Sequence, residues 1–297
     1  MKVAVAKYPV GAPRDFQAFA DKQAHLLSDA AAAGARLAVL PEYLSLELGA
    51  TLDGTARGDV PATLRAIQGH HAQWLSLYAE LAASHRMHVV AGSFLLAHGE
   101  SRYRNRSYWF TPSGTHGWQD KLQLTAFEKA TGVIEGGDAL KVFDLGEIRA
   151  AVSICYDCEF PLTVRAQRQA GARLLVVPSC TDTQAGATRV RTGCLARALE
   201  NRMFVARSVT AGEAPWSPAL DANTGEAALY APMDVGLPAD GIVAQTRGNQ
   251  VWAVAELDFE ALERSRRDAH VANDGDWDRQ LAPGLQRSAV SVLSREG

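Results

Sequence analysis

Residues 153–161 read SICYDCEFP, and this stretch decides both the fold and the chemistry that the chain is expected to have. An apolar run, AAVSI, leads into it, and Pro161 at its end suits the first turn of a helix. A strand, a short turn and a helix in that order are typical of an α/β protein. The turn itself holds Cys155 and Cys158, two of only four cysteines in the chain.

The two cysteines are compatible with a redox couple, with half of a metal site, or with one nucleophile beside a buried thiol. The attacking thiol of a redox couple normally lies in the first turn of a helix, whereas Pro161 indicates that this helix begins after both cysteines. A zinc site needs two more ligands, but Cys180 and Cys194 are not a second close pair, and no histidines stand at finger spacing. The sequence therefore favours Cys155 as a reactive thiol, with core positions for the other three cysteines.

Apolar strands and amphipathic helices alternate from one end of the chain to the other. Strands are predicted over residues 2–8, 36–40, 88–96, 106–111, 115–121, 140–144, 147–155, 173–178, 203–210, 226–230, 241–246 and 250–257. Helices are predicted over residues 13–33, 64–81, 161–171, 188–201 and 258–269, the second from an apolar stripe that steps by three and four. This alternation predicts one α/β domain with helices covering the sheet faces.

Composition narrows the classes of protein to which the chain can belong. Its 297 residues are 47% hydrophobic and 21% charged, as in ordinary globular domains. The formal net charge of −3 gives no electrostatic reason to expect nucleic acid or an anionic membrane as a partner. No apolar stretch approaches the roughly 18 residues that a membrane span needs. Four cysteines in so long a chain argue against a disulfide scaffold, so we expect a cytoplasmic protein with reduced thiols.

Three reactive side chains each follow a predicted strand. Glu42 follows LAVLP, Lys121 follows THGWQD and Cys155 follows AAVSI. Catalytic groups gather at the carboxyl ends of strands in such folds. A thiol with the usual pKa of about 8.5 is mostly protonated at neutral pH and needs a base. The apolar neighbours of Glu42 are expected to raise its pKa and suit it to that role, and Lys121 is a cation that can stabilise an oxyanion.

Three segments resemble the signatures of the nitrilase, or carbon–nitrogen hydrolase, superfamily: LPEYLSLE (40–47), DKLQLTAFE (120–128) and SICYDCEFP (153–161). Their order and their placement at strand ends match the family, and CYDCEFP is most similar to an amidase-like branch. The resemblance implies the α/β fold of that superfamily, a four-layer α-β-β-α sandwich. We expect residues 1–270 to form this carbon–nitrogen hydrolase domain, and residues 271–297 to be a C-terminal tail that packs on the domain or on a partner subunit.

The resemblance also implies roles for individual residues. Glu42 is expected to be the base and acid, Lys121 the oxyanion stabiliser and Cys155 the nucleophile. Glu128 matches a second glutamate that holds substrate or lysine, and the backbone N–H of Tyr156 is a candidate oxyanion donor beside Lys121. These roles predict a thiol hydrolase that cleaves a small-molecule amide through a thioester, with no cofactor and no metal. The alternatives are a nitrilase and a catalytically silent ligand-binding member of the fold.

The resemblance extends to the surroundings of the site. Arg197 and Glu200, or Arg197 and Asn201, are expected to support the cysteine turn from a neighbouring helix. A homodimer or higher homo-oligomer is expected, with an interface through residues 161–171 and 188–200. Lys7 stands where the family usually carries glutamine, and this departure concerns the packing at that strand end.

Substrate specificity is expected to come from four loops, residues 43–60, 124–138, 181–188 and 212–232. The last loop carries Trp216, Asp221, Asn223, Glu226 and Tyr230, which would suit a substrate with both an apolar and a polar part.

Overall fold

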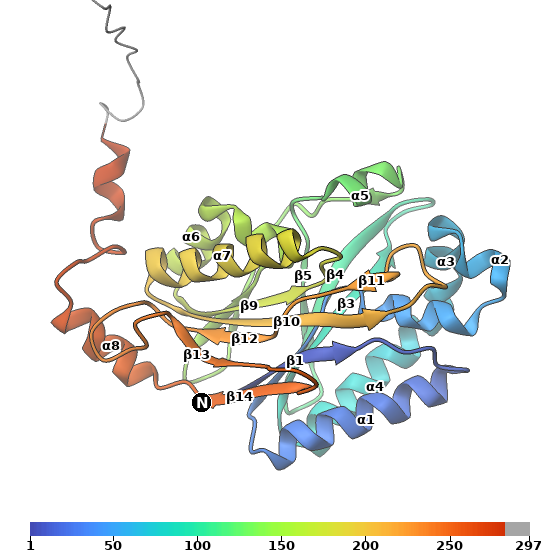
Figure 1. The fold of residues 1–297 in the computed structure, drawn as a ribbon, viewed down its shortest axis with the longest axis horizontal. Coiled ribbons are helices and arrows are strands. Elements are labelled where there is room, and N and C mark those ends of the chain that lie inside the picture. The colour runs from blue at the N-terminus through green and yellow to red at the C-terminus, as the bar shows by residue number, and fades with distance from the viewer. Residues whose placement is uncertain (283–297) are drawn as a thin grey trace, which may run out of the picture.

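The computed structural model describes residues 1–282 of the chain, which form two β-sheets packed face to face between layers of helices (Figure 1). The strand order in this part of the chain is β5-β4-β3-β2-β1-β10-β9-β8-β7. The sheets meet where the end of β1 runs parallel to β10, with Lys7 opposite Val209 and Pro9 opposite Ala211. The architecture is the predicted α/β class and the predicted four-layer sandwich.

Each sheet is built around parallel strands with antiparallel strands at its edges. The first contains β1 (Lys2–Pro9), β2 (Leu37–Leu40), β3 (His88–Ala97), β4 (Tyr103–Phe110), β5 (His116–Asp120), β6 (Ile134–Glu135) and β14 (Trp252–Glu256). The second contains β7 (Val142–Asp144), β8 (Arg149–Val152), β9 (Ala172–Ser179), β10 (Phe204–Glu213), β12 (Ala228–Tyr230) and β13 (Ile242–Gln245), and β11 (Ala222–Asn223) pairs with the end of β10.

The helices cover the outer faces of these sheets. The α-helices are α1 (Phe16–Ala32), α2 (Gly54–Arg57), α3 (Val60–Ile67), α4 (His71–Ser84), α5 (Ala126–Ala130), α6 (Pro161–Gln169), α7 (Gln184–Asn201) and α8 (Phe259–Asp268). Four 3₁₀ segments are η1 (Leu44–Thr51), η2 (Gln68–His70), η3 (Cys155–Glu159) and η4 (Trp277–Leu281). α1 and α4 lie on the first sheet, whereas α6 and α7 lie on the second (Figure 1).

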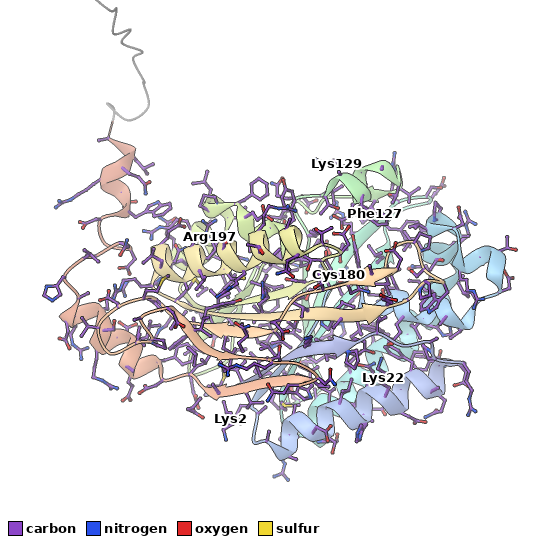
Figure 2. The ribbon with its side chains drawn as sticks, in the orientation of Figure 1. Lys2, Lys22, Phe127, Lys129, Cys180 and Arg197 are labelled. Carbon is purple, nitrogen blue, oxygen red and sulfur yellow. The ribbon has the colours of Figure 1, made fainter. Side chains whose placement is uncertain are left out.

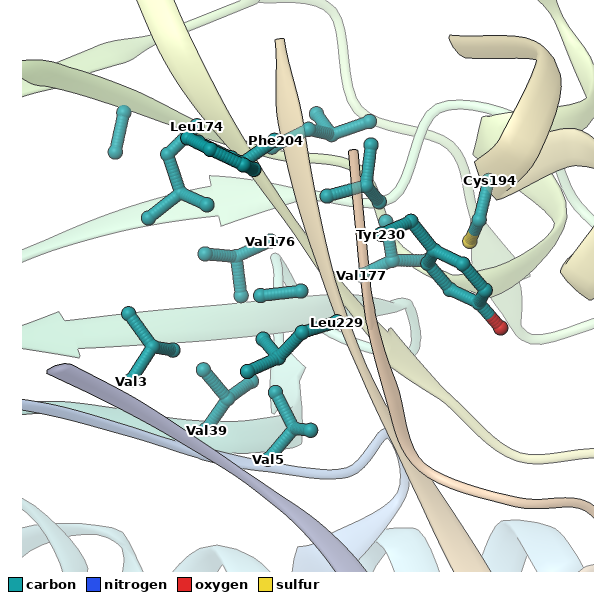
Figure 3. Close-up of a cluster of buried hydrophobic side chains, with 14 of the residues drawn as sticks. Val3, Val5, Val39, Leu174, Val176, Val177, Cys194, Phe204, Leu229 and Tyr230 are labelled. Carbon is teal, nitrogen blue, oxygen red and sulfur yellow. The ribbon is translucent and has the colours of Figure 1, made fainter. Parts of the chain in front are cut away.

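The alternation of side chains along β1 explains why two separate cores form. Val3 and Val5 point into the space between the sheets, where they pack with residues of β9 and β12 (Figure 3). Ala4 and Ala6 point the other way, toward α1 and α4. Their small side chains let helices approach the sheet closely, so one strand serves both interfaces.

The second predicted helix is interrupted, which is a departure from the sequence-based prediction of 64–81. The chain forms α3, a single 3₁₀ turn (η2) and then α4. The apolar stripe continues across the break, because Ile67 and Trp74 are both fully buried. His71 on this stripe is half-buried, with its Nε2 atom 2.8 Å from the hydroxyl of Tyr108.

Part of the expected C-terminal tail is described. Arg165 of α6 donates a hydrogen bond to the carbonyl of Asp274 (3.1 Å), and its guanidinium lies 4.8 Å from the ring centroid of Trp277. Residues 283–297, the remainder of that tail, lie outside the described residues. Within residues 1–282, no helix has the length and apolar character needed to cross a bilayer.

Candidate active site

The residues that follow β2, β5 and β8 converge on one cavity. Glu42, Lys121 and Cys155 all line it, and the cavity has a volume of about 310 Å³. Their side chains are almost completely buried, with exposed fractions of 1%, 1% and 4%. The structure therefore brings together three residues that are separated by up to 113 positions, at the strand ends where the sequence predicted them.

Backbone contacts fix the position of Glu42. Gly92 of β3 has a positive φ of 60°, and a Cβ atom there would lie 2.0 Å from the carbonyl oxygen of Pro41, so only glycine allows this approach. Tyr43 is itself left-handed (φ 61°), and its N–H donates to Ser93 Oγ at 2.9 Å. The hydroxyl of Thr210 donates to the carbonyl of Glu42 at 3.2 Å, which links this turn to β10.

Lys121 lies between two carboxylates. Its Nζ atom is 2.8 Å from Glu42 Oε1 and 2.8 Å from Glu128 Oε2. The side-chain amide of Asn105 donates to the same two residues, at 2.8 Å to Glu42 and 3.1 Å to Glu128. The backbone N–H of Cys180 donates to Glu42 Oε2 at 3.0 Å. Both carboxylates are therefore held by Asn105 on β4 and by Lys121 after β5, and Glu42 is held in addition by the segment that follows β9 in the second sheet.

The two glutamates differ in how readily they take up a proton. Burial raises the pKa of Glu42, and the nearby Glu128 charge raises it further, although Lys121 opposes both. Burial also acts to raise the pKa of Glu128, but the attraction of Lys121 prevails and leaves that pKa below its usual value. Burial alone would lower the pKa of Lys121, and the two carboxylates raise it instead, so Lys121 stays protonated. Glu42 is the member of this cluster that is suited to accept a proton.

The cysteine turn has a strained backbone at its first residue. Cys155 begins η3 with a φ of 48°, in the left-handed region that is unfavourable for a residue with a side chain. Its thiol donates to the carbonyl of Cys180 at 3.6 Å. Burial raises the pKa of Cys155 well above its usual value, and the Glu42 charge adds to this effect. The resting thiol is therefore protonated and depends on a base.

Asp157 ties the cysteine turn to the lysine segment. Its carboxylate accepts hydrogen bonds from the backbone N–H groups of Ile154 (3.2 Å), Leu122 (3.1 Å) and Gln123 (2.7 Å). Burial raises its pKa to about 6, although these three donors act in the opposite direction. One side chain thus fixes the distance between the residues next to Lys121 and the residue before Cys155.

Cys158 occupies a different environment from Cys155. It is fully buried, does not line the cavity, and its thiol lies 3.7 Å from the carbonyl of Val190 on α7. A Cβ atom on Gly193 would lie 3.0 Å from Cys158 Sγ, so glycine allows α7 to pack directly on the turn. Arg197 donates to the carbonyl of Cys158 (3.3 Å) and to Glu200 (3.0 Å), as expected of residues that support the turn.

Neither alternative interpretation of the cysteine pair receives support from residues 1–282. All four cysteines are free thiols, and no cluster of three or more histidine, cysteine or acidic side chains in this range could hold a metal ion.

All four predicted loops contribute to the cavity, but not through all of the expected residues. The lining includes Tyr43, residues 125–127, 181–182 and residues of the 212–232 loop, with Tyr156 beside Cys155. Of the five residues expected from that last loop, it includes Asp221 but not Trp216, Asn223, Glu226 or Tyr230. Tyr230 is fully buried on the face of the second sheet that α7 covers, toward Cys194 (Figure 3), because the pleat of β12 turns it away from the space between the sheets. Trp216 packs against Gly49.

Two residues of the site escaped the sequence-based prediction. Asn105 lies in the middle of β4, and only strand pairing brings its amide to Glu42 and Glu128. Cys180 was expected in the core, yet it is half-buried and lines the cavity after the end of β9 (Figure 2). The sequence offered one signal for Asn105, which is that an uncharged amide stands at an inward-facing position of a strand.

The α-β-β-α sandwich and the buried cavity at its strand ends define the fold class of the protein. The chain belongs to the carbon–nitrogen hydrolase family, whose model matches residues 2–249. It is 29% identical over 272 residues to the probable hydrolase YhcX of Bacillus subtilis (strain 168). That match covers 91% of this chain and 52% of YhcX, so the chain spans about half the length of this relative.

Two further comparisons agree with this family. The chain is 25% identical over 249 residues to the omega-amidase NIT2-A of Xenopus laevis, with 81% of this chain and 83% of the relative covered. The crystal structure of Saccharomyces cerevisiae Nit3, a member of the nitrilase superfamily, superposes with a TM-score of 0.72 at 21% identity, covering 91% of this chain and 94% of that one. The predicted superfamily is confirmed.

Proposed function

We propose that the protein is a thiol amidase that cleaves a small-molecule amide through a thioester on Cys155. The observation that carries this proposal is the position of Lys121, bonded to Glu42 and Glu128 in the cavity that Cys155 lines. A nucleophile, a base with a raised pKa and a fixed cation are the three groups that acyl transfer from an amide needs.

Acylation begins with proton transfer from the Cys155 thiol to Glu42 as sulfur attacks the amide carbonyl. Burial disfavours the anionic forms of both Glu42 and Cys155. The proton transfer neutralises Glu42 while a negative charge forms on the carbonyl oxygen of the substrate, so the net charge of the buried cluster does not change. Lys121 and the backbone N–H of Tyr156 are the proposed partners of that oxyanion. They are fixed before the reaction, so stabilising the charge requires little reorganisation.

Glu42 then acts as the acid. It returns the proton to the leaving nitrogen, the C–N bond breaks and the thioester remains on Cys155. In the second half of the reaction Glu42 takes a proton from water as the water oxygen attacks the thioester. The C–S bond then breaks to release the carboxylic acid, and Glu42 returns its proton to the sulfur of Cys155. A carboxyl group with a raised pKa serves both steps, since it can take up the proton of the thiol or of water and release it again.

Glu128 is proposed as a positioning residue. It does not line the cavity, but it holds Lys121 from behind and carries the charge that helps to raise the pKa of Glu42.

The relatives and the sequence around the nucleophile favour amides over nitriles. One relative is an omega-amidase, and CYD after the strand resembles the amidase and carbamoylase branches of the superfamily. The experiment is ammonia release from a panel of short aliphatic and aromatic amides, N-carbamoyl compounds and matching nitriles, with Cys155→Ala as the blank. Turnover of the amides is expected. Turnover of nitriles alone would overturn the amidase assignment, and silence with an unreactive Cys155 would favour a ligand-binding protein.

We also propose a homodimer through α6 and α7. Leu162 on α6 and Leu199 on α7 are exposed apolar side chains, with exposed fractions of 71% and 36%. A monomer mass at micromolar concentration in solution would refute this interface.

A further inference from the structure

The mouth of the cavity carries an excess of negative charge. Four carboxylates line the cavity against two cations, Lys121 and Arg189, which gives a net charge of −2 when Cys155 is a neutral thiol. Three of those carboxylates lie outside the proposed catalytic group: Glu159 at the end of η3, Asp182 after β9 and Asp221 before β11. They come from three separate segments, so a single charged loop does not account for the excess.

The cations of the cavity are already paired. Lys121 bonds Glu42 and Glu128, and the guanidinium of Arg189 lies 3.6 Å from Glu159. Asp182 and Asp221 therefore have no cationic partner among the described residues. Both are exposed at the mouth. Asp221 accepts one local hydrogen bond, from the N–H of Ala222 at 2.9 Å. Two carboxylates that face one cavity without a counter-charge favour a cation there over an anion.

The walls between the two ends are apolar and partly aromatic. Phe127 of α5 lines the cavity and is 39% exposed (Figure 2). Tyr156, Val190 and Ala219 continue this surface. An alkyl chain suits such walls, and aromatic faces also attract cations. A cavity of about 310 Å³ is at the small end of the range for ligand sites, so the chain must be short.

We propose that the substrate is a short aliphatic amide with an ammonium group at the end distant from the amide. The amide lies at Cys155 and the ammonium lies between the carboxylates of Asp182 and Asp221. Arg189 does not offer a site for a substrate carboxylate, because Glu159 neutralises it. This inference rests on the proposed amidase function and adds the charge of the substrate to it.

The test compares three amides of equal chain length: 5-aminopentanamide, hexanamide and the monoamide of adipic acid. They place an ammonium, a methyl group and a carboxylate at the same distance from the amide. We expect kcat/KM to be about tenfold higher for the ammonium compound than for hexanamide, and lowest for the carboxylate compound. The preference should shrink as salt concentration rises, since both aspartates are exposed.

The double variant Asp182→Asn/Asp221→Asn isolates the contribution of the mouth. The ratio of kcat/KM for 5-aminopentanamide to that for hexanamide is expected to fall to about one. Glu80→Gln/Glu100→Gln is the matched control, since it removes two exposed carboxylates away from the cavity and should keep the wild-type ratio. Equal kcat/KM for the three amides, a preference for the carboxylate compound, or a ratio unchanged in the double variant would overturn the proposal while leaving the amidase assignment intact.

A second readout does not depend on turnover. Cys155 is modified with a cationic reagent, 2-aminoethyl methanethiosulfonate, and with an anionic one, 2-sulfonatoethyl methanethiosulfonate, and peptide mass spectrometry follows the product. Relative to a small neutral thiol, the cationic reagent should be favoured about tenfold, and the double variant should lose this advantage. No advantage in the wild type would refute the proposal. Failure of every amide to react, with this charge preference intact, would refute the amidase assignment alone.

Discussion

The two ends of the cavity are built differently. At the deep end, Glu42, Lys121 and Glu128 are at most 1% exposed, and each bonds at least two partners at 3.1 Å or less. At the mouth, Asp182 and Asp221 are exposed and lack a counter-charge among the described residues. The deep end is held by strand ends of both sheets, and the mouth is formed largely by loops.

Under the proposed function, this difference separates the chemical step from the choice of substrate. A buried, fully bonded cluster keeps its geometry whichever substrate enters, so it suits the chemical step. Exposed carboxylates on loops contribute less energy to a contact, and loops vary without disturbing the fold, so they suit the choice of substrate. Substitutions at the deep end should therefore lower kcat, whereas those at the mouth should raise KM for a cationic amide.

The largest effect is expected for Glu42→Gln, which keeps the volume of the side chain but cannot accept a proton. We expect kcat to fall by about 10⁴-fold at saturating amide. The fold should survive, because Lys121 keeps its bond to Glu128. Steady-state kinetics together with circular dichroism measure both effects. Asp182→Asn, at the mouth of the cavity, is the control. For a cationic amide we expect it to change KM more than kcat. Near-native turnover in Glu42→Gln would remove Glu42 as the base.

Lys121→Arg tests whether the deep end needs a particular shape as well as a charge. Arginine keeps the charge but replaces a compact ammonium with a planar fork, and a 1% exposed site leaves no space for it. We expect kcat to fall by about 10² to 10³-fold. Lys129→Arg, on an exposed lysine of the neighbouring α5, should leave kcat unchanged. A Lys121→Arg enzyme within a few-fold of wild type would mean that charge alone is sufficient.

Asp157→Asn is expected to loosen the deep end rather than remove a reacting group. An amide NH₂ would face backbone N–H groups that now bond a carboxylate, so the free energy of unfolding should fall by about 2 kcal/mol. Urea denaturation at neutral pH measures this change. Asp278→Asn removes an exposed carboxylate of η4 and serves as the control. Equal stability of the two variants would show that Asp157 does not connect the cysteine and lysine segments.

The smallest effect concerns pH. Glu42 must be ionised to act as the base, so kcat/KM should rise with pH through its raised pKa, and the acid limb should lie above pH 4.5, the ordinary value for this group. Glu128→Gln removes the negative charge that helps to raise the pKa of Glu42, so the limb should move to lower pH. The measurement is a pH–rate profile of the wild type and of Glu128→Gln. An acid limb that moves to higher pH in the variant, or does not move, would contradict the assigned effect of Glu128 on the pKa of Glu42.

The same contrast explains what the sequence could and could not predict. Glu42, Lys121 and Cys155 follow recognisable strands, and parallel strands present their ends at one edge, so local patterns were sufficient to place them together. Asn105 and the N–H of Cys180 reach Glu42 only through pairing across the sheets, which no local pattern encodes. Tyr230 was expected at the cavity because it stands in the 212–232 loop, yet it lies on β12 and its side chain is fully buried.

The central claim is that Cys155 is the nucleophile and Cys158 is a packed core thiol. The most direct measurement is titration with limiting iodoacetamide, with carbamidomethylation at each cysteine read by peptide mass spectrometry and residual amidase activity measured in the same samples. Activity should fall in proportion to modification of Cys155 and reach zero at one label per chain, while Cys158 stays unmodified and Cys158→Ser keeps most activity. Activity that survives full modification of Cys155, or equal labelling of Cys158 in the folded protein, would contradict the claim.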